Sequence, residues 1–431
     1  VNNPLFAAGG VLMEKRDRLS WAILQQVAGE YRGEFLDNRL VVNLGVRAPF
    51  FKRNLTNYCF TTSAGGFVDC FGQNAALNSA YAGYNPYSFN STTNVVTGVS
   101  GPQQRVFNYN RVLPNIGLVY HVGGDVSFFA NYSKGLSVPG TDSLYNAFYY
   151  PVGTSQATPA PETTDNFDGG LRYRSGRVQG EFSVFFNQFH NRLATAYDPE
   201  LDQNVFRNLG NVKKYGLDGY LAFQPDEHLD LYVSASWLNS EIQDDIEVGK
   251  NGDGSIIFAP TAGKHESGAP LYTVGIGVRG HFGPVDIGFN AKRTGERYVY
   301  DTNLPTFTGT YVPAGAKACT TATPPVCTTA IAPSASQIAN TAQIYPDKAP
   351  AYWLVNLDAR LKLGWMGLND DTYLQLNVYN LFDQFYVGGF GGALIQSNTF
   401  SRTTGLASYG NPNFVQIGAP RTVSGTLVLK F

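Results

Sequence analysis

The stretch LDLYVSASW, residues 229–237, decides the fold class of this chain. Its odd positions are Leu229, Leu231, Val233, Ala235 and Trp237, and the even positions beside and between them are His228, Asp230, Tyr232, Ser234 and Ser236. Side chains of a β-strand point to opposite faces in turn, so this segment has one apolar and one polar face. Helical spacing does not fit the pattern.

The same alternation recurs along most of the chain. It predicts about thirteen strands, at 19–32, 39–54, 104–121, 125–136, 163–175, 177–196, 205–224, 228–242, 270–281, 285–299, 350–363, 371–387 and 414–431. On the polar faces it places charged residues, among them Asp168, Arg172, Asp286, Lys292, Asp358, Arg360 and Lys362. The chain is therefore expected to be all-β.

The connections between these strands alternate between short and long. Short ones lie at 33–38, 123–124, 176, 225–227, 282–284 and 364–370. The others, all but one of them long, lie at 55–103, 137–162, 197–204, 243–269, 300–349 and 388–413. Transmembrane β-barrels have short periplasmic turns and long extracellular loops, whereas a soluble sandwich or propeller has no reason for this asymmetry. The pattern predicts an antiparallel transmembrane β-barrel.

The expected strand count is odd, while a closed single-chain bacterial barrel has an even number of strands. An open edge in hydrocarbon leaves unpaired backbone groups that cost several kcal/mol each. We therefore expect further strands before the first one visible. The start, Val1-Asn2-Asn3-Pro4, has no signal-peptide features, so either a leader has been removed or the sequence begins within a longer protein.

Composition supports an all-β membrane protein. Glycine (47), phenylalanine (29) and tyrosine (26) are frequent and methionine (2) is rare, which favours strands and tight turns over packed helices. The net charge of −2 provides no basic surface for nucleic acid. No stretch approaches the roughly eighteen apolar residues of a membrane helix, but a barrel strand needs only about ten residues of alternating character.

Four aromatic residues of the loop 137–162 are candidate ligand-binding residues: Tyr145, Phe148, Tyr149 and Tyr150. Aromatic rings on an extracellular loop suit stacking on a sugar ring, a catecholate or a porphyrin, with the hydroxyls fixing orientation. The alternative is that these rings pack against neighbouring loops or belong to the outer aromatic belt.

Loop 243–269 carries four carboxylates beside two glycines: Asp244, Asp245, Glu247 and Asp253. Clustered carboxylates bind Ca²⁺ through their oxygens, so these four are a weak calcium candidate. Their spacing does not match an EF-hand loop, and a solvated acidic loop is the alternative. No other metal or cofactor is expected.

The four cysteines form two local pairs, Cys59/Cys70 and Cys319/Cys327, in long polar segments. Two loop disulfides formed in an oxidising compartment are the expected outcome. A metal site is the alternative, although no Cys-x-x-Cys pattern or neighbouring histidine supports it.

No enzymatic motif stands out. The five histidines are scattered, and neither a Gly-x-Ser-x-Gly elbow nor a phosphate-binding glycine loop is present. We therefore expect a protein that is not an enzyme.

Four motifs resemble the TonB-dependent outer-membrane receptors. They are the segment 374–383 (LQLNVYNLFD) followed by Tyr386, the closing segment 417–421 (IGAPR) with alternation to Phe431, the segment 161–173 (PETTDNFDGGLRY), and 208–212 (NLGNV) with 216–219 (GLDG). The likeness covers most of 105–431, in the family's order. It implies a 22-stranded barrel in the cell outer membrane, of which residues 1–431 would be the C-terminal portion, with the N-terminal plug absent.

The resemblance also implies a function. We expect active uptake of a scarce nutrient captured by the loops, with an iron–siderophore complex as the leading ligand class and an oligosaccharide or cobalamin behind it. The implied partners are that nutrient, outer-membrane lipid, and the energy transducer TonB, through the missing N-terminal region. A passive porin is the second hypothesis, and a barrel enzyme or adhesin the third.

Overall fold

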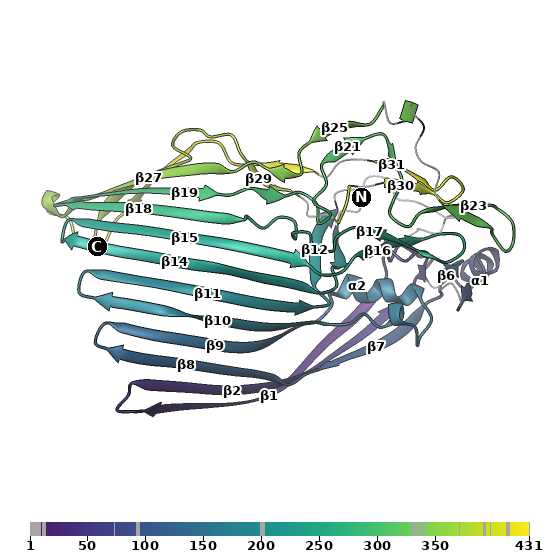
Figure 1. Cartoon of the computed structure of the whole chain (residues 1–431), viewed down its shortest axis with the longest axis horizontal. Helices are drawn as coiled ribbons and strands as arrows, with labels where there is room; N and C mark the ends of the chain where they lie inside the picture. Colours follow the sequence, from purple (N-terminus) through teal and green to yellow (C-terminus); the bar gives the residue numbers. More distant parts are fainter. Residues whose placement is uncertain are drawn as a thin grey trace.

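The structure is a computed structural model. It describes residues 10, 14–72, 74–91, 95–198, 203–329, 334, 336–337, 340–369, 371–390, 394–396, 398–410 and 414–430. Figure 1 shows long strands running side by side, with an elaborate set of loops at one end. Val1–Pro4 and Phe431, on which the sequence expectations drew, lie outside the described residues.

One large antiparallel sheet dominates the described part of the chain. Along the sheet, its strands are β1 (Arg18–Phe35), β2 (Leu40–Asn57), β8 (Leu113–Gly123), β9 (Val126–Ser137), β10 (Glu162–Ser175), β11 (Val178–His190), β14 (Val212–Asp226), β15 (Leu229–Ile242), β18 (Tyr272–Phe282), β19 (Val285–Thr294), β27 (Tyr352–Lys362), β28 (Tyr373–Tyr379) and β33 (Thr422–Val428), with β7 (Gln103–Asn110) also paired to β2. Each of the thirteen predicted ranges contributes to this sheet. The predicted fold class is confirmed.

Some strand ends differ from the prediction. The predicted strand at 104–121 is divided into β7 and β8 by Arg111 and Val112. The strand predicted at 177–196 stops at His190, because Asn191 adopts a left-handed backbone (φ 53°). Likewise β28 ends at Tyr379, before Asn380 with φ 52°.

Small hairpins form at the loop end, both beyond these breaks and within the long connections. They include β12 (Leu193–Asp198) with β13 (Gln203–Asn208), β16 (Ile246–Lys250) with β17 (Ile256–Ala259), β21 (Thr306–Thr308) with β25 (Ala342–Tyr345), β23 (Lys317–Cys319) with β24 (Cys327–Thr329), β29 (Val387–Phe390) with β32 (Val415–Ile417), and β22 (Thr310–Tyr311) with β31 (Leu406–Tyr409) and β30 (Asn398–Ser401).

Two short helices and further pairs complete the loops. They are α1 (Ala75–Tyr84), α2 (Thr141–Asn146), β3 (Phe60–Thr61) with β4 (Val68–Asp69), β5 (Ser88–Asn90) with β6 (Val95–Thr97), and β20 (Arg297–Tyr298) with β26 (Lys348–Ala349).

All the long connections meet at one end of the sheet and the tight turns at the other (Figure 1), as the alternation of lengths predicts.

The outer face of the sheet is a continuous apolar surface. Strand register aligns Phe167 with Phe186, and Phe186 with Tyr215, so that apolar rows cross from strand to strand. These side chains are 39–48% exposed in the isolated chain, although they are large and hydrophobic. A surface of this kind is stable where hydrocarbon covers it.

The inner face is polar, and several of its charges pair across strands. Arg172 lies 2.8 Å from Glu181, and Arg279 lies 3.0 Å from Asp358. Asp286 lies 3.4 Å from the Lys362 amine. The expected alternation of charged residues on one face is therefore present, with partners that the linear pattern did not identify.

The buried apolar clusters lie at the loop end of the sheet, among the loops and the adjoining strand ends. One cluster joins Leu55 and Phe107 to Leu144, and another joins Leu209, Val212 and Ile242. No helix in the described residues is long and apolar enough to cross a membrane.

A charge on the outer face is expected to destabilise the protein in lipid. Val184, at the centre of β11, is 48% exposed on the apolar face, and its neighbour Ser183 points to the polar face. Val184→Arg should lower the free energy of unfolding by about 2–4 kcal/mol, because the guanidinium enters hydrocarbon. Urea titration in lipid vesicles measures this value, and Ser183→Arg is the matched control. Equal losses for both variants would contradict the assignment of faces.

Candidate functional site

The aromatic cluster of loop 137–162 is largely inside the protein. Tyr145 is 2% exposed and Phe148 is fully buried, and both pack with Leu55. The Tyr145 hydroxyl donates to the carbonyl oxygens of Leu19 and Thr56, each at 3.0 Å. These two rings therefore hold the loop against its neighbours, so the prediction that they contact a ligand does not fit this arrangement.

Tyr149 and Tyr150 differ from those two residues because they are half-buried. Their rings meet edge-on, with centroids 5.7 Å apart. Burial raises the pKa of both hydroxyls. A ligand-binding role for these two residues stays a prediction. Arg105 fixes their loop by donating to the carbonyls of Ala147 and Tyr150.

The carboxylates of the acidic loop accept hydrogen bonds from the protein itself. Asp244 accepts from the Asn211 amide, and Asp245 accepts from the amides of Thr261 and Ala262. Among the described residues, no three His, Cys, Asp or Glu side chains form a group that could hold a metal ion. Calcium binding by Asp244, Asp245, Glu247 and Asp253 therefore stays a prediction. The carboxylates of Asp244 and Asp245 act as hydrogen-bond acceptors that shape the loop.

Both cysteine pairs are joined as disulfides, Cys59–Cys70 and Cys319–Cys327. The second closes the β23–β24 hairpin. The Cys319 amide donates to the Arg402 carbonyl at 2.8 Å, which connects this hairpin to another long loop.

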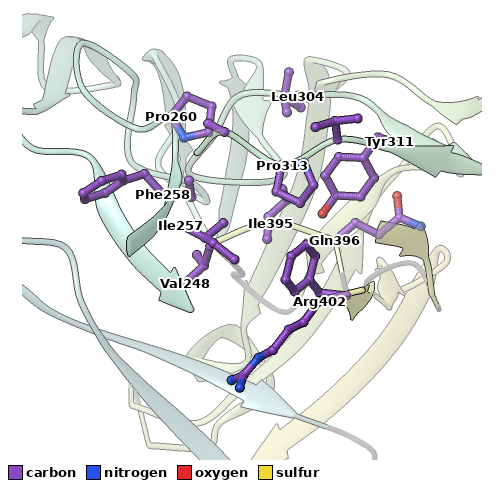
Figure 2. A pocket seen from close by; sticks show the side chains of 14 residues that line it. Val248, Ile257, Phe258, Pro260, Leu304, Tyr311, Pro313, Ile395, Gln396 and Arg402 are labelled. Carbon is purple, nitrogen blue, oxygen red and sulfur yellow. The ribbon is translucent and has the colours of Figure 1, made fainter. Parts of the chain in front are cut away.

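A pocket of about 660 Å³ lies where three long loops meet. Its walls come from 248–260, 304–314 and 395–402, that is, from the predicted loops 243–269, 300–349 and 388–413. Figure 2 shows Ile257, Pro313, Tyr311 and Ile395 gathered around the same space. The volume is within the range of small-molecule sites. The loops were identified from the sequence, but no motif singled out these lining residues.

Most of the lining is apolar, and three side chains supply polar groups. Gln396 is 2% exposed, and its amide exchanges hydrogen bonds with the Phe307 backbone, each of 2.9 Å. The Tyr311 ring stacks on Tyr409, with centroids 4.3 Å apart. Arg402 is exposed, and in Figure 2 its side chain extends to one side of the pocket.

A hydrogen-bonded bracket holds two of the pocket walls together. The Asn251 side chain donates to the Gly315 carbonyl and accepts from the Lys317 amide, each at 2.8 Å. The Lys317 amine lies 3.0 Å from Asp253. Hydrogen bonds from Ser255 and then Lys317 hold the pKa of Asp253 at about 2.

An ion-pair network anchors the same loops to the barrel rim. Glu266 lies 2.7 Å from the Lys214 amine and 3.1 Å from the Arg192 guanidinium, which also pairs with Glu162 at 3.0 Å. Burial alone would raise the pKa of Glu266, but Lys214 and Arg192 reverse the shift and hold the pKa below its ordinary value of 4.5. Glu266 is therefore ionised at neutral pH.

A membrane-facing sheet with a polar inner face, and a pocket built from loops at one end, defines an outer-membrane β-barrel protein. The family model "TonB dependent receptor-like, beta-barrel" matches residues 6–381. The chain belongs to this family, which consists of receptors and transporters located in the outer membrane.

Solved structures share the fold. The ferric yersiniabactin uptake receptor FyuA from Yersinia pestis is 12% identical with a TM-score of 0.54, and the match covers 95% of this chain and 46% of that one. The siderophore receptor PiuA from Acinetobacter baumannii is 14% identical with a TM-score of 0.55, at 93% and 42% coverage. The copper transporter OprC is 11% identical with a TM-score of 0.50, at 85% and 43% coverage. The chain spans less than half the length of these three.

Removing the second disulfide is expected to loosen the β23–β24 hairpin, which contacts the pocket residue Arg402. Cys319→Ser with Cys327→Ser should cost about 2–3 kcal/mol of local stability, because the open hairpin gains conformational freedom. Limited proteolysis of loop 300–349 measures the effect. The pair Cys59→Ser with Cys70→Ser, outside the pocket, is the control and should leave this loop protected. Unchanged cleavage in both variants would contradict the role of the hairpin.

The anchoring network should depend on pH. Because the folded pKa of Glu266 is lowered, its contribution is complete above about pH 4.5 and is lost as the pH falls through the folded value. Glu266→Gln should destabilise loop 243–269 by about 1–3 kcal/mol at neutral pH, since the partly buried Lys214 loses its charged partner and, within the described residues, Arg192 keeps only Glu162. Hydrogen exchange of the loop amides measures this effect.

Acidification should make the unsubstituted protein approach the behaviour of Glu266→Gln. Glu296→Gln is the control, because Glu296 makes an exposed ion pair with Lys348 at 3.3 Å, of the kind that contributes little. Rates are compared as protection factors, which remove the intrinsic pH dependence of amide exchange. Protection factors of the loop amides that stay constant on acidification of the unsubstituted protein would contradict the anchoring role of Glu266.

Proposed function

We propose that this chain forms the barrel wall and the ligand-capturing loops of a receptor for active uptake of a scarce nutrient across the outer membrane. The energy comes from TonB, which acts through parts of the receptor that lie outside the chain. An iron–siderophore complex is the proposed nutrient class.

The observation that carries this proposal is the pocket built by three long loops at one end of the barrel wall. A passive pore needs a water-filled passage and no binding pocket at its mouth. A receptor for a dilute solute needs one, because capture precedes passage. The anchoring of Glu266 and the bracket at Asn251 give that pocket a defined shape.

The proposed nutrient class draws on the family and on its solved relatives. FyuA and PiuA are a ferric yersiniabactin uptake receptor and a siderophore receptor. OprC, with the same fold, is a copper transporter. A transport measurement tests this class against the alternatives.

Deletion of the gene is expected to abolish uptake of one ferric siderophore under iron limitation. The physical reason is that such complexes are too large and too dilute for diffusion through porins. Accumulation of radioactive iron from a panel of ferric siderophores measures the effect, with cobalamin and maltotriose as the alternative cargoes. Reintroducing the complete gene should restore uptake.

Deletion of TonB in the complemented strain is the energy control, and uptake should fall to background. Uptake that persists without TonB, together with steady ion conductance of the purified protein in planar bilayers, would instead identify a passive channel.

A further inference from the structure

The chemistry of the loop pocket narrows the kind of ligand that it can hold. Its inner surface is formed mainly by aliphatic, proline and aromatic side chains, with Ile257, Pro313 and Ile395 in the centre (Figure 2). Ile257 is 3% exposed, so this wall is packed from behind and presents a fixed apolar surface. Binding of an apolar ligand against this surface is favourable, because it removes apolar area of both partners from water.

The buried amide in the lining has no N–H group left to donate to a ligand's hydroxyl groups. The Gln396 oxygen accepts from the Phe307 amide, and its nitrogen donates to the carbonyls of Phe307 and Gly410. A sugar chain would bury several hydroxyls against this wall without partners, at a cost for each. The lining therefore disfavours an oligosaccharide.

One positive charge at the pocket is available. Within the described residues, the Arg402 guanidinium makes no hydrogen bond or ion pair, although it lines the pocket. The nearby charges are already engaged: Lys317 pairs with Asp253, and Asp245 accepts two backbone amides. The Arg402 backbone is held in place by the Cys319 amide.

We propose that the pocket binds a ligand with a flat aromatic body and a single anionic group, which pairs with Arg402. Tyr311 and Phe400 provide rings for stacking, and the guanidinium fork matches a carboxylate. The inference rests on the proposed function, because it names the ligand class of the same site.

Binding of matched probes to the complete receptor in lipid nanodiscs tests this inference. The probes are 1-naphthoate, its neutral counterpart 1-naphthamide, and maltotriose, each titrated by calorimetry. Naphthoate is expected to bind about tenfold more tightly than naphthamide, as for a charge-assisted hydrogen bond replacing a neutral one. Maltotriose should bind more weakly than either.

Substitutions then show which pocket residues cause the preference for naphthoate over naphthamide. Arg402→Gln should abolish the difference between naphthoate and naphthamide, and Arg402→Lys should retain part of it. Ile395→Ser should weaken both aromatic probes to a similar extent. Arg111→Gln, at an exposed arginine between β7 and β8, is the matched control and should change neither.

Equal binding of naphthoate and naphthamide to the unsubstituted receptor, a preference retained in Arg402→Gln, or tighter binding of maltotriose would overturn the inference. TonB-dependent iron uptake is measured separately. If that uptake is absent while the naphthoate preference persists, the transport proposal fails and the ligand class stands. If uptake is present without a charge preference, the ligand class alone fails.

Discussion

The fold depends on the rule that a backbone in hydrocarbon must satisfy its own hydrogen-bonding groups. Antiparallel pairing satisfies them between neighbouring strands, and the two-residue alternation lets one face meet lipid while the other meets water. In this chain the apolar rows, such as Phe167, Phe186 and Tyr215, consequently lie on the outside. Arrangements that a soluble protein would avoid, with exposed aromatic rows and a charged interior face, are here the stable ones.

Because the wall has its apolar side facing outward, the loops need apolar clusters of their own. The cluster around Leu55, Tyr145 and Phe148 fixes loop 137–162 against the strand ends nearest the loops. The ion pairs of Glu266 anchor another. These contacts fix the long connections in one arrangement, so that a pocket can form between them. When the walls of a binding site are already fixed, fewer side chains and loops have to be ordered as the ligand binds, and less affinity is lost to that ordering.

How far the sequence predicts this structure depends on the range of the interactions involved. The alternation at 229–237 is local, so strands, faces and the separation of loops from turns can be predicted from it. Strand ends at Asn191 and Asn380 depend on single left-handed residues inside a pattern that otherwise continues. The burial of Tyr145 depends on Leu55 and Phe107, which are distant in the chain. The pocket is unpredictable for the same reason, because its walls come from three loops whose contacts, such as Cys319 with Arg402, no local motif encodes.

Under the proposed function, the lateral pairing of charges on the inner face has a consequence for a solute that passes along it. Where Arg172 is paired with Glu181, Arg279 with Asp358 and Lys362 with Asp286, each positive field is largely cancelled within a few ångströms. A charged solute moving past these pairs meets shallow wells of either sign rather than one deep one. Its residence at these three pairs should therefore be brief.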